Sequence, residues 1–481
     1  MVIDALRHIP SRGEILFRGD ARLTPYNHDT MLTGDPDALV RPRDIQECRE
    51  ILAYCHAHRL PVTFCAGHTA MTGSSVAQSG LLLSIEHLTG IRDIGLHNGR
   101  PQATAAPGVF LGDFQRAVAS EGFFYPPSPT SRNEAMLGAT IATNATGDNT
   151  YKYGTTRRYV RAMRVIMADG TQRLLERPAD QQISELKNTA GYFLLGTPID
   201  HFIGSEGTLG LIVEVTVDLL PQPQPHFGLL IFCPSNDVAL SIIGEAHRDA
   251  AVSPSALEYI DQAALQIMAT HPTFPSPPAA AQAAVLCYQE YAEEMRDPFM
   301  EAWFALLERA APEMHALLDA TIVAEHPADE ERLRTWRHHI PAHVNEIGHR
   351  LEGDDGGKVG SDWWVPIGQM PAMMAYMYHL SDAIHVPYLA FGHLGNGHPH
   401  VNYLARNAKE RQMAIQAVDD CCRKAVALGG GVAGEHGLGK LKRDLLAIQH
   451  PTPVIDTMRA LKQQYDPHWI LGRGNILVPP E

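Results

Sequence analysis

The chain has 481 residues, of which 45% are hydrophobic and 19% charged, a composition typical of a globular protein with two or three domains. Its formal net charge of −15 argues against a nucleic-acid-binding function, and no apolar run reaches the roughly 18 residues that a membrane-spanning helix needs. The seven cysteines form no CxxC pair, which excludes a built-in iron–sulfur cluster of the multi-cysteine kind and favours a cytoplasmic protein, with any membrane association made through a partner.

The first part of the chain alternates helices, strands and glycine-rich loops. Residues 44–60 carry apolar side chains at helical spacing, and residues 61–64 and 80–85 are short apolar strands. The alternation continues to Leu220 and is then interrupted by the stiff segment PQPQP at residues 221–225, which cannot enter a sheet interior. The sequence therefore predicts an α+β domain that ends at this segment.

The second part is predicted to begin with a strand at 227–232 and a helix at 238–248, followed by alanine-rich helices between 279 and 320. The pattern then predicts a strand at 358–366, a helix at 370–385, strands at 388–392 and 398–404 around a Gly-Asn-Gly turn, and a helix at 407–428. Residues 465–478 are expected to return to the first domain. The predicted organisation is an N-terminal extension at 1–35, a first domain at 36–221, a second domain at 226–440 and a returning C-terminal segment at 441–481.

Three loops of the first domain are rich in Gly, Ser and Thr, at residues 66–76, 138–147 and 203–210. Backbone amides exposed by such loops bind phosphate oxygens without basic side chains. Neither GxGxxG after a first strand nor GxxxxGK[ST] occurs, which disfavours a Rossmann or P-loop fold. A single glycine of this kind is also typical of an ordinary turn, but the ordered set of three loops indicates a nucleotide-binding surface.

Two motifs of the second domain contain histidines, FGHLGNGHPH at residues 391–400 and GEHGLGK at residues 434–440. Imidazole and carboxylate groups are the ligands of a divalent metal, and a further histidine beside them can move a proton near neutral pH. The alternative interpretation is a hydrogen-bonded hairpin with a structural glutamate.

Taken in order, the motifs PVTFCAGHTAMTG, PPSPTSRNEAMLGATIATNATG, KYGTTRRYV, IGSEGTLG, GHLGNGHPH and GEHGLGKLK resemble the FAD-linked oxidases of the vanillyl-alcohol-oxidase superfamily, whose FAD-binding domain is of the PCMH type. Over residues 36–477 the chain is most similar to the branch that contains D-lactate dehydrogenase, D-2-hydroxyglutarate dehydrogenase and the GlcD type of glycolate oxidase subunit. The resemblance implies an α+β fold: an FAD-binding domain of two α+β subdomains at 36–221, and a cap domain at 226–440 with an antiparallel sheet covered by helices.

The resemblance also implies which residues contact FAD. They are Gly67, His68, Thr69, Thr72 and Gly73 in the first segment; Pro127, Ser131, Gly138, Thr140, Asn144 and Gly147 in the second; and Gly204, Glu206, Gly207 and Gly210 in the third. Some relatives attach FAD covalently to a histidine near the position of His68. Because the attaching position falls one residue later, we expect His68 to pack on the backbone or to contact a phosphate.

For the reaction, the resemblance implies that His393, His400 and Glu435 bind a divalent metal, zinc or manganese, and that His436 removes the hydroxyl proton of the substrate. The metal would lower the pKa of that hydroxyl, and the flavin would accept the hydride. Arg337 matches best the arginine that binds the substrate carboxylate in this branch, because a guanidinium holds a carboxylate by two parallel hydrogen bonds.

Lys358 is a second candidate for binding the carboxylate. Two positions depart from the family pattern: Asn396 stands where Asp is usual, and His398 where Asn is usual. Because alternate residues share one face of a strand, His398 lies on the face of His400 and could replace the amide contact, add a fourth metal ligand or face solvent. These departures put the substrate preference in question.

The leading hypothesis is an FAD-dependent dehydrogenase that oxidises a D-2-hydroxyacid of the D-lactate type to the 2-oxoacid. Because the chain carries no cluster or haem motif, its electrons must pass to a separate acceptor: a protein, a quinone or an iron–sulfur partner. We also expect a homo-oligomer. The alternatives are an oxygen-using flavin alcohol oxidase, which would not need the metal, and a non-catalytic flavin-bearing subunit of an iron–sulfur complex. The acid, the acceptor and the metal cannot be named from the sequence.

Overall fold

The computed structural model describes residues 2–29, 31–181, 183 and 187–479 and divides the chain into two compact units. Unit 1 comprises Met1–Gly147, Gly154–Gln222 and Ala433–Glu481, and unit 2 comprises Asp148–Tyr153 and Pro223–Val432. The expected second domain therefore ends before residue 440, and the loop with Glu435 and His436 belongs to unit 1. The structure also includes the N-terminal 35 residues in unit 1.

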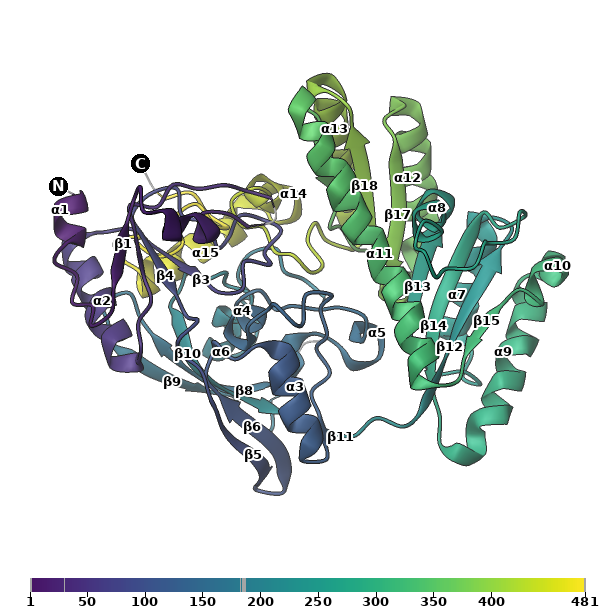
Figure 1. The fold of residues 1–481 in the computed structure, drawn as a ribbon, viewed down its shortest axis with the longest axis horizontal. Helices are drawn as coiled ribbons and strands as arrows, with labels where there is room; N and C mark the ends of the chain where they lie inside the picture. The colour runs from purple at the N-terminus through teal and green to yellow at the C-terminus, as the bar shows by residue number, and fades with distance from the viewer. Residues whose placement is uncertain (1, 30, 182, 184–186, 480–481) are drawn as a thin grey trace. The chain divides into compact units, whose positions relative to one another are not determined.

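The first sheet of unit 1 has the strand order β1-β2-β4-β3 (Figure 1), with β2, β4 and β3 parallel and β1 antiparallel to β2. Its strands are β1 (Ile15–Phe17), β2 (Ala38–Val40), β3 (Val62–Cys65) and β4 (Leu81–Ser84). Helix α2 (Ile45–His58) begins after Asp44, whose side chain accepts a hydrogen bond from the backbone N–H of Glu47. Its apolar face packs into the core of this sheet. The predicted helix at 44–60 and the strands at 61–64 and 80–85 are confirmed.

The second sheet of unit 1 is antiparallel and has the order β5-β6-β10-β8-β9. Its strands are β5 (Ile91–His97), β6 (Arg100–Ala105), β8 (Val160–Ile166), β9 (Gln172–Glu176) and β10 (Leu211–Asp218). A small ribbon joins β7 (Phe123–Phe124) to β11 (Leu220–Pro221). The remaining helices are α1 (Val2–Leu6), α3 (Leu111–Ser120), α4 (Leu137–Ala142), α6 (Pro198–Phe202), α14 (Leu446–Gln449) and α15 (Thr452–Tyr465).

The C-terminal segment joins the edge of the first sheet. The backbone N–H of Val62 donates to the carbonyl of Ile470, and that of Gly472 donates to the carbonyl of Val62, both at 2.8 Å. The predicted return of residues 465–478 to the first domain is therefore confirmed.

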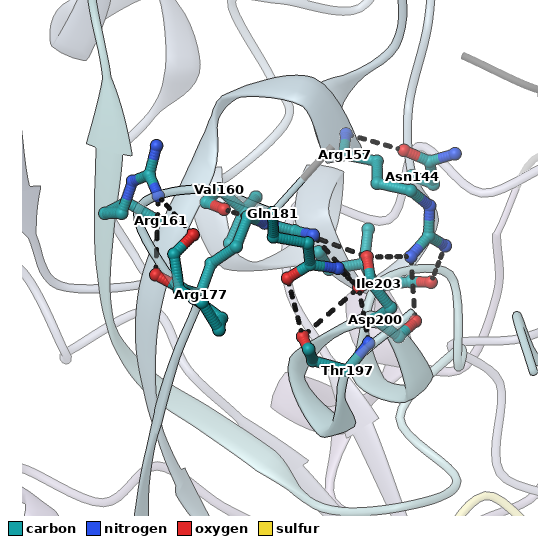
Figure 2. A network of polar contacts seen from close by, with 10 residues as sticks. Asn144, Arg157, Val160, Arg161, Arg177, Gln181, Thr197, Asp200 and Ile203 are labelled. Atoms are coloured by element: carbon teal, nitrogen blue, oxygen red, sulfur yellow. Dashed lines mark hydrogen bonds and ion pairs between the residues drawn. The ribbon is translucent and has the colours of Figure 1, made fainter. Parts of the chain in front are cut away.

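Unit 1 also contains a network of buried charges around Asp200 (Figure 2). The carboxylate accepts hydrogen bonds from Arg157 at 2.9 Å and from Arg177 at 2.8 and 2.9 Å. Arg177 also donates to the carbonyl of Val160, and Arg157 to that of Ile203. The network therefore ties α6 to the end of β9 and the start of β8.

Unit 2 is built on one antiparallel sheet with the order β15-β12-β14-β13-β17-β18-β16. Its strands are β12 (His226–Cys233), β13 (Pro254–Asp261), β14 (Ala283–Glu290), β15 (Ile322–Ala324), β16 (Gly357–Gly360), β17 (Tyr388–His393) and β18 (His398–Ala405). Its helices are α5 (Thr150–Tyr153), α7 (Asn236–Arg248), α8 (Gln262–Met268), α9 (Arg296–Ala310), α10 (His315–Leu318), α11 (Pro327–Leu351), α12 (Met370–Ile384) and α13 (Ala408–Ala427).

Helices cover both faces of this sheet. On one face α8 and α11 share a core with Leu286 and Phe391, and Figure 1 shows α11 lying along the strands. On the other face the hydroxyl of Tyr259 bonds to residues of α7 and α12, and that of Tyr403 bonds to Ser381 of α12. The expected antiparallel sheet covered by helices is thereby confirmed.

One prediction for unit 2 is wrong: residues 283–290, expected within alanine-rich helices, form strand β14. The strand lies between β12 and β13 and is buried on both faces, so its nearly continuous apolar run does not distinguish a strand from a helix. The predicted strand at 358–366 is shorter, ending at Gly360. None of the helices in the described part of the chain combines the length and the hydropathy that a membrane crossing requires.

Candidate functional site

The three glycine-rich loops converge within unit 1. The first loop follows β3, the second surrounds α4, and the third connects α6 to β10. A Cβ atom on Gly67 would lie 1.9 Å from the carbonyl oxygen of Glu134, and one on Gly147 would lie 2.0 Å from that of Ser128. Because no side chain fits at these positions, glycine allows the first loop to touch the segment before α4, and that segment to touch the end of the second loop.

The third loop is bound to α4 by its backbone. The N–H of Gly204 donates to the carbonyl of Ile141 at 3.0 Å, and that of Glu206 to the carbonyl of Ala142 at 2.8 Å. Gly210 lies apart from these contacts and packs against Val165 and Phe202 instead. The structure therefore brings the predicted cofactor segments together, with Gly210 serving the packing of β10.

Buried polar atoms in these loops test whether a nucleotide cofactor fits. Among the described residues, the Oγ1 of Thr72, the Nδ2 of Asn144 and the Oγ1 of Thr146 have no hydrogen-bond partner, although these side chains are at most 4% exposed. Buried polar groups are normally paired, because an unmade hydrogen bond costs about 1–3 kcal/mol. A bound molecule with hydrogen-bonding groups, such as FAD, would satisfy these atoms, so the residues present fit the expected cofactor.

His68 lies in the first loop with a positive φ of 55°. Its ring meets that of Tyr26 edge-on at 5.5 Å, and burial lowers the pKa of its imidazole. Its attachment to FAD is not tested by these contacts. In the second segment, the carbonyl of Pro127 accepts from the side chain of Gln115 at 2.9 Å, and Ser131 accepts at its backbone carbonyl in a turn with Glu134.

The glycine-rich loop at 437–440 is attached to two of the cofactor loops. The carboxylate of Glu206 accepts from the N–H of Leu438 at 2.8 Å and from that of Gly439 at 2.7 Å. Lys440 donates from its backbone to Thr72 and from its Nζ to Gly73. Burial raises the pKa of Glu206 to about 7 and lowers that of Lys440 to about 8.

Asn475 completes this attachment, and sequence reasoning did not identify it. Its Oδ1 accepts from Lys440 at 2.6 Å, and its Nδ2 donates to the carbonyls of Ser74 and Glu206 at 2.8 and 3.1 Å. The C-terminal segment therefore secures the first and third cofactor loops and the 437–440 loop at one place.

Glu435 and His436 lie at the start of the same loop in unit 1. Glu435 pairs with Lys187 at 3.3 Å, and both side chains are less than a tenth exposed. The adjacent backbone is held by Thr189, whose N–H donates to Ala433 and whose hydroxyl accepts from the N–H of Gly437. The loop that carries the expected carboxylate ligand and base is thus anchored at both of its ends.

The histidines of unit 2 gather on the hairpin of β17 and β18. His393 faces His398 across the ladder, and the ring centroid of His400 lies 5.2 Å from that of His393 and 4.8 Å from that of His398. The turn at Leu394–Asn396 contains Asn396 and confirms the predicted hairpin. Two imidazoles at this spacing suit zinc or manganese, so the residues present fit the expected metal.

His398 is fully buried, which excludes the solvent-facing alternative. Its Nε2 lies 3.1 Å from the Oδ1 of Asp362, and both side chains are 0% exposed. Asp362 follows β16 and was not singled out in the sequence. A buried histidine beside a carboxylate is satisfied within the protein, which leaves the structural and the ligand alternatives for His398.

Arg337 lies on α11 and is 3% exposed. Its guanidinium donates to Glu258 at 2.9 and 3.1 Å, and Glu258 in turn contacts the Nδ1 of His393. Lys358, the second candidate for the substrate carboxylate, donates to Asn345 at 2.6 Å. Glu258 was also missed in the sequence, although a lone carboxylate in the apolar run ALEYI is the signal that could have identified it.

Comparison with known proteins gives two family matches. Residues 36–175 match the model of an FAD binding domain, and residues 223–476 match that of the C-terminal domain of FAD linked oxidases. The chain is 31% identical to glycolate oxidase subunit GlcD of Bacillus subtilis, over 92% of this chain and 89% of that protein. It is 27% identical to D-2-hydroxyglutarate dehydrogenase of Stutzerimonas stutzeri over 99% of both chains, and 26% identical to D-lactate dehydrogenase of Anaerostipes hadrus over 95% and 94%.

Solved structures show the same fold. A p-cresol methylhydroxylase matches with a TM-score of 0.70 at 14% identity, over 99% of this chain and 96% of that chain. An alkyldihydroxyacetonephosphate synthase matches with a TM-score of 0.69 at 16% identity, over 98% and 85%.

Proposed function

Because this chain belongs to the FAD-linked oxidase family, in the branch of D-lactate dehydrogenase, D-2-hydroxyglutarate dehydrogenase and glycolate oxidase subunit GlcD, we propose that it oxidises a D-2-hydroxyacid of the D-lactate type to the 2-oxoacid. One observation of the structure supports this most: within unit 1, Glu206, Lys440 and Asn475 tie the loop that carries Glu435 and His436 to the glycine-rich loops. The cofactor cradle and the predicted base therefore belong to one connected structure.

In this proposal FAD supplies the acceptor for the hydride that leaves the α-carbon. A zinc or manganese ion held by His393, His400 and Glu435 supplies Lewis acidity toward the substrate hydroxyl. His436 removes the proton of that hydroxyl, so that the two electrons of the Cα–H bond leave as hydride and a carbonyl forms. The predicted role of Arg337 in binding the substrate carboxylate competes with its contact to Glu258.

The electrons then pass to a separate acceptor, which we propose to be a protein, a quinone or an iron–sulfur partner. We further propose a cytoplasmic homo-oligomer that meets a membrane only through such a partner. A second candidate function is supported by the name of the relative from Bacillus subtilis: the chain would then be a flavin-bearing subunit that turns over only within an oxidase complex.

Anaerobic reduction of the purified flavoprotein by D- and L-2-hydroxyacids tests the proposal. We expect bleaching of the flavin absorbance by D-acids alone, its loss after chelation and its return with zinc or manganese. His436→Asn should slow the bleaching by about 10²–10⁴-fold without loss of FAD. His87→Asn, at a half-exposed histidine of unit 1, is the control and should leave the rate unchanged. Bleaching that survives chelation would contradict the metal role, and absence of bleaching with every acid would favour the second candidate.

A further inference from the structure

Glu258 is a buried carboxylate in an otherwise apolar strand of unit 2. It lies on β13 between Leu257 and Tyr259 and is 2% exposed. The ladder between β13 and β17 pairs Tyr259 with Gly392, so the next position of the same register sets Glu258 opposite His393. A carboxylate at such a position needs partners, because an isolated buried charge is very costly.

The two oxygens of Glu258 serve two different partners. Its Oε1 contacts the Nδ1 of His393, and its Oε2 accepts from the Nε and Nη2 of Arg337 at 3.1 and 2.9 Å. Burial raises the pKa of Glu258, but the charges of His393 and Arg337 outweigh burial and bring that pKa below its ordinary value. Glu258 is therefore an ionised link between an imidazole and a guanidinium.

Arg337 is itself fixed in place. Its guanidinium carbon lies 5.0 Å from the ring centroid of Phe391, which precedes His393 by two residues on the same strand. Stacking on an aromatic face and pairing with a buried carboxylate hold a guanidinium in one orientation. Arg337 thus supports Glu258 from α11, on the face of the sheet that also carries the histidine.

A second cation site at this place is disfavoured by the same contacts. Ligand atoms of Asp148, Glu258 and His393 lie within 4.8 Å of one another, a geometry that could hold an ion. However, Arg337 already brings a positive charge to Glu258, and His338 lies 3.4 Å from Asp148. A divalent ion would be repelled by these groups, so the carboxylate of Glu258 acts toward the imidazole.

We propose that Glu258 is a positioning residue for His393, and that Arg337 positions Glu258 in turn. The inference rests on the proposed function, in which His393 is a metal ligand. A ligating histidine usually donates its other ring N–H to a carboxylate, which fixes the tautomer and the ring orientation and raises the basicity of the ligand atom. With Nδ1–H directed to Glu258, the Nε2 of His393 is the atom that meets the metal. Arg337 then acts on the site through Glu258 and not on the substrate carboxylate.

Metal affinity of the flavoprotein tests this role without relying on turnover. Metal-stripped protein with FAD bound is titrated with Zn²⁺, and separately with Mn²⁺, against a competing fluorescent chelator. Glu258→Gln should weaken metal binding by about 10–100-fold, the usual effect of removing such a partner, while the FAD content per chain stays at the wild-type value. The control is Glu290→Gln, which removes a carboxylate from the neighbouring strand β14 that pairs with Lys152 at 2.7 Å. It should leave the metal affinity unchanged.

The single variant leaves Arg337 buried without a negative partner and can fail to fold for that reason alone. The double variant Glu258→Gln with Arg337→Met removes both charges and should restore folding, but its metal affinity should stay as low as that of the single variant. Wild-type affinity in the folded double variant would overturn the positioning role. If instead wild-type protein binds neither metal, the proposed function itself fails, and the two failures are thereby distinguished.

Discussion

Each unit of the molecule contains a buried carboxylate that is held by arginine, Asp200 in unit 1 and Glu258 in unit 2. Both oxygens of Asp200 accept from arginine, and one also accepts from Gln181 at 3.1 Å and from the N–H of Thr197 at 3.2 Å. Only one oxygen of Glu258 accepts from arginine, and the other contacts the imidazole of His393. The first carboxylate is saturated by permanent donors, whereas the second is shared with a group that can bind a metal.

This difference separates a structural lock from a positioning device. Arg157, beside Asp200, also donates its backbone N–H to the Oδ1 of Asn144 at 2.9 Å, so the network around Asp200 supports the second cofactor loop through the backbone. No group in that network titrates near neutral pH in its ordinary state. The network around Glu258 ends on a histidine of the hairpin, so a change there should alter ligand binding as well as stability.

The largest effect is expected where the structural lock is broken. Asp200→Asn leaves Arg157 and Arg177 buried without a neutralising charge and should lower the free energy of unfolding by about 3–5 kcal/mol. Asp218→Asn, in the partly exposed pair with Arg161, is the control and should cost about 1 kcal/mol or less. Denaturant titration measures both. Equal small losses would show that the buried network contributes no more than a surface pair.

Asp261 gives a third kind of buried carboxylate, with backbone partners. Among the described residues, its hydrogen bonds come from the N–H groups of Ala264 and Ala390 at 2.8 and 2.6 Å. Without a cation beside it, burial raises the pKa of Asp261 from 3.8 to about 7. The folded protein therefore keeps a proton on Asp261 between about pH 4 and pH 7 that the unfolded chain has lost, and the contribution of this group to stability falls as the pH rises through that interval.

Asp261→Asn should remove this part of the pH dependence. At about 1.4 kcal/mol per pKa unit, the difference between the unfolding free energies of wild type and variant should change by up to about 4 kcal/mol between pH 4 and pH 7, in favour of the variant at the higher pH. Denaturant titrations at a series of pH values measure this difference. A difference that does not depend on pH would mean that Asp261 is already ionised at the lower end.

A smaller effect, with opposite signs in two measurements, is expected at the cofactor loops. Thr72→Val keeps the shape of a fully buried side chain whose hydroxyl has no partner within the described residues. Without FAD the variant should be more stable by about 1–2 kcal/mol, because an unsatisfied hydroxyl is removed. With FAD it should bind about tenfold more weakly, because a hydrogen bond to the cofactor is lost. Thr171→Val, at an exposed turn of the same unit, is the control. Unchanged FAD affinity would contradict the assigned contact.

The parts of this molecule that could be predicted from the sequence are those whose chemistry is local. The cofactor loops are recognisable because close backbone approach requires glycine at fixed positions, as at Gly67 and Gly147. His393 and His400 are recognisable because one hairpin carries both. The helix at Ile45–His58 was predicted because its cap and its apolar spacing are both encoded within a few residues.

The partners of the site residues were not predictable, because they come from distant segments. Glu258 precedes His393 by 135 residues, and Lys187 precedes Glu435 by 248. Their pairing depends on which strands become neighbours, and periodicity within one strand carries no such information. The same limitation explains the error at β14, because a strand buried on both faces has no polar alternation to mark it.

His398 gives the smallest predicted effect and decides whether it resembles Asp200 or His393. Since its Nε2 lies 3.1 Å from a fully buried Asp362, we expect a structural pair. His398→Asn restores the residue that is usual in the family, and its amide can still donate to Asp362. The variant should therefore lose about 1 kcal/mol of unfolding free energy and keep the wild-type affinity for zinc or manganese. His398→Ala removes the donor and should lose about 3 kcal/mol, because a buried charge is left without its partner. Both variants need the same metal titration. If both bind the metal about tenfold or more weakly while FAD content is unchanged, His398 is a fourth ligand, and the buried pair belongs with the metal site instead of with the structural locks.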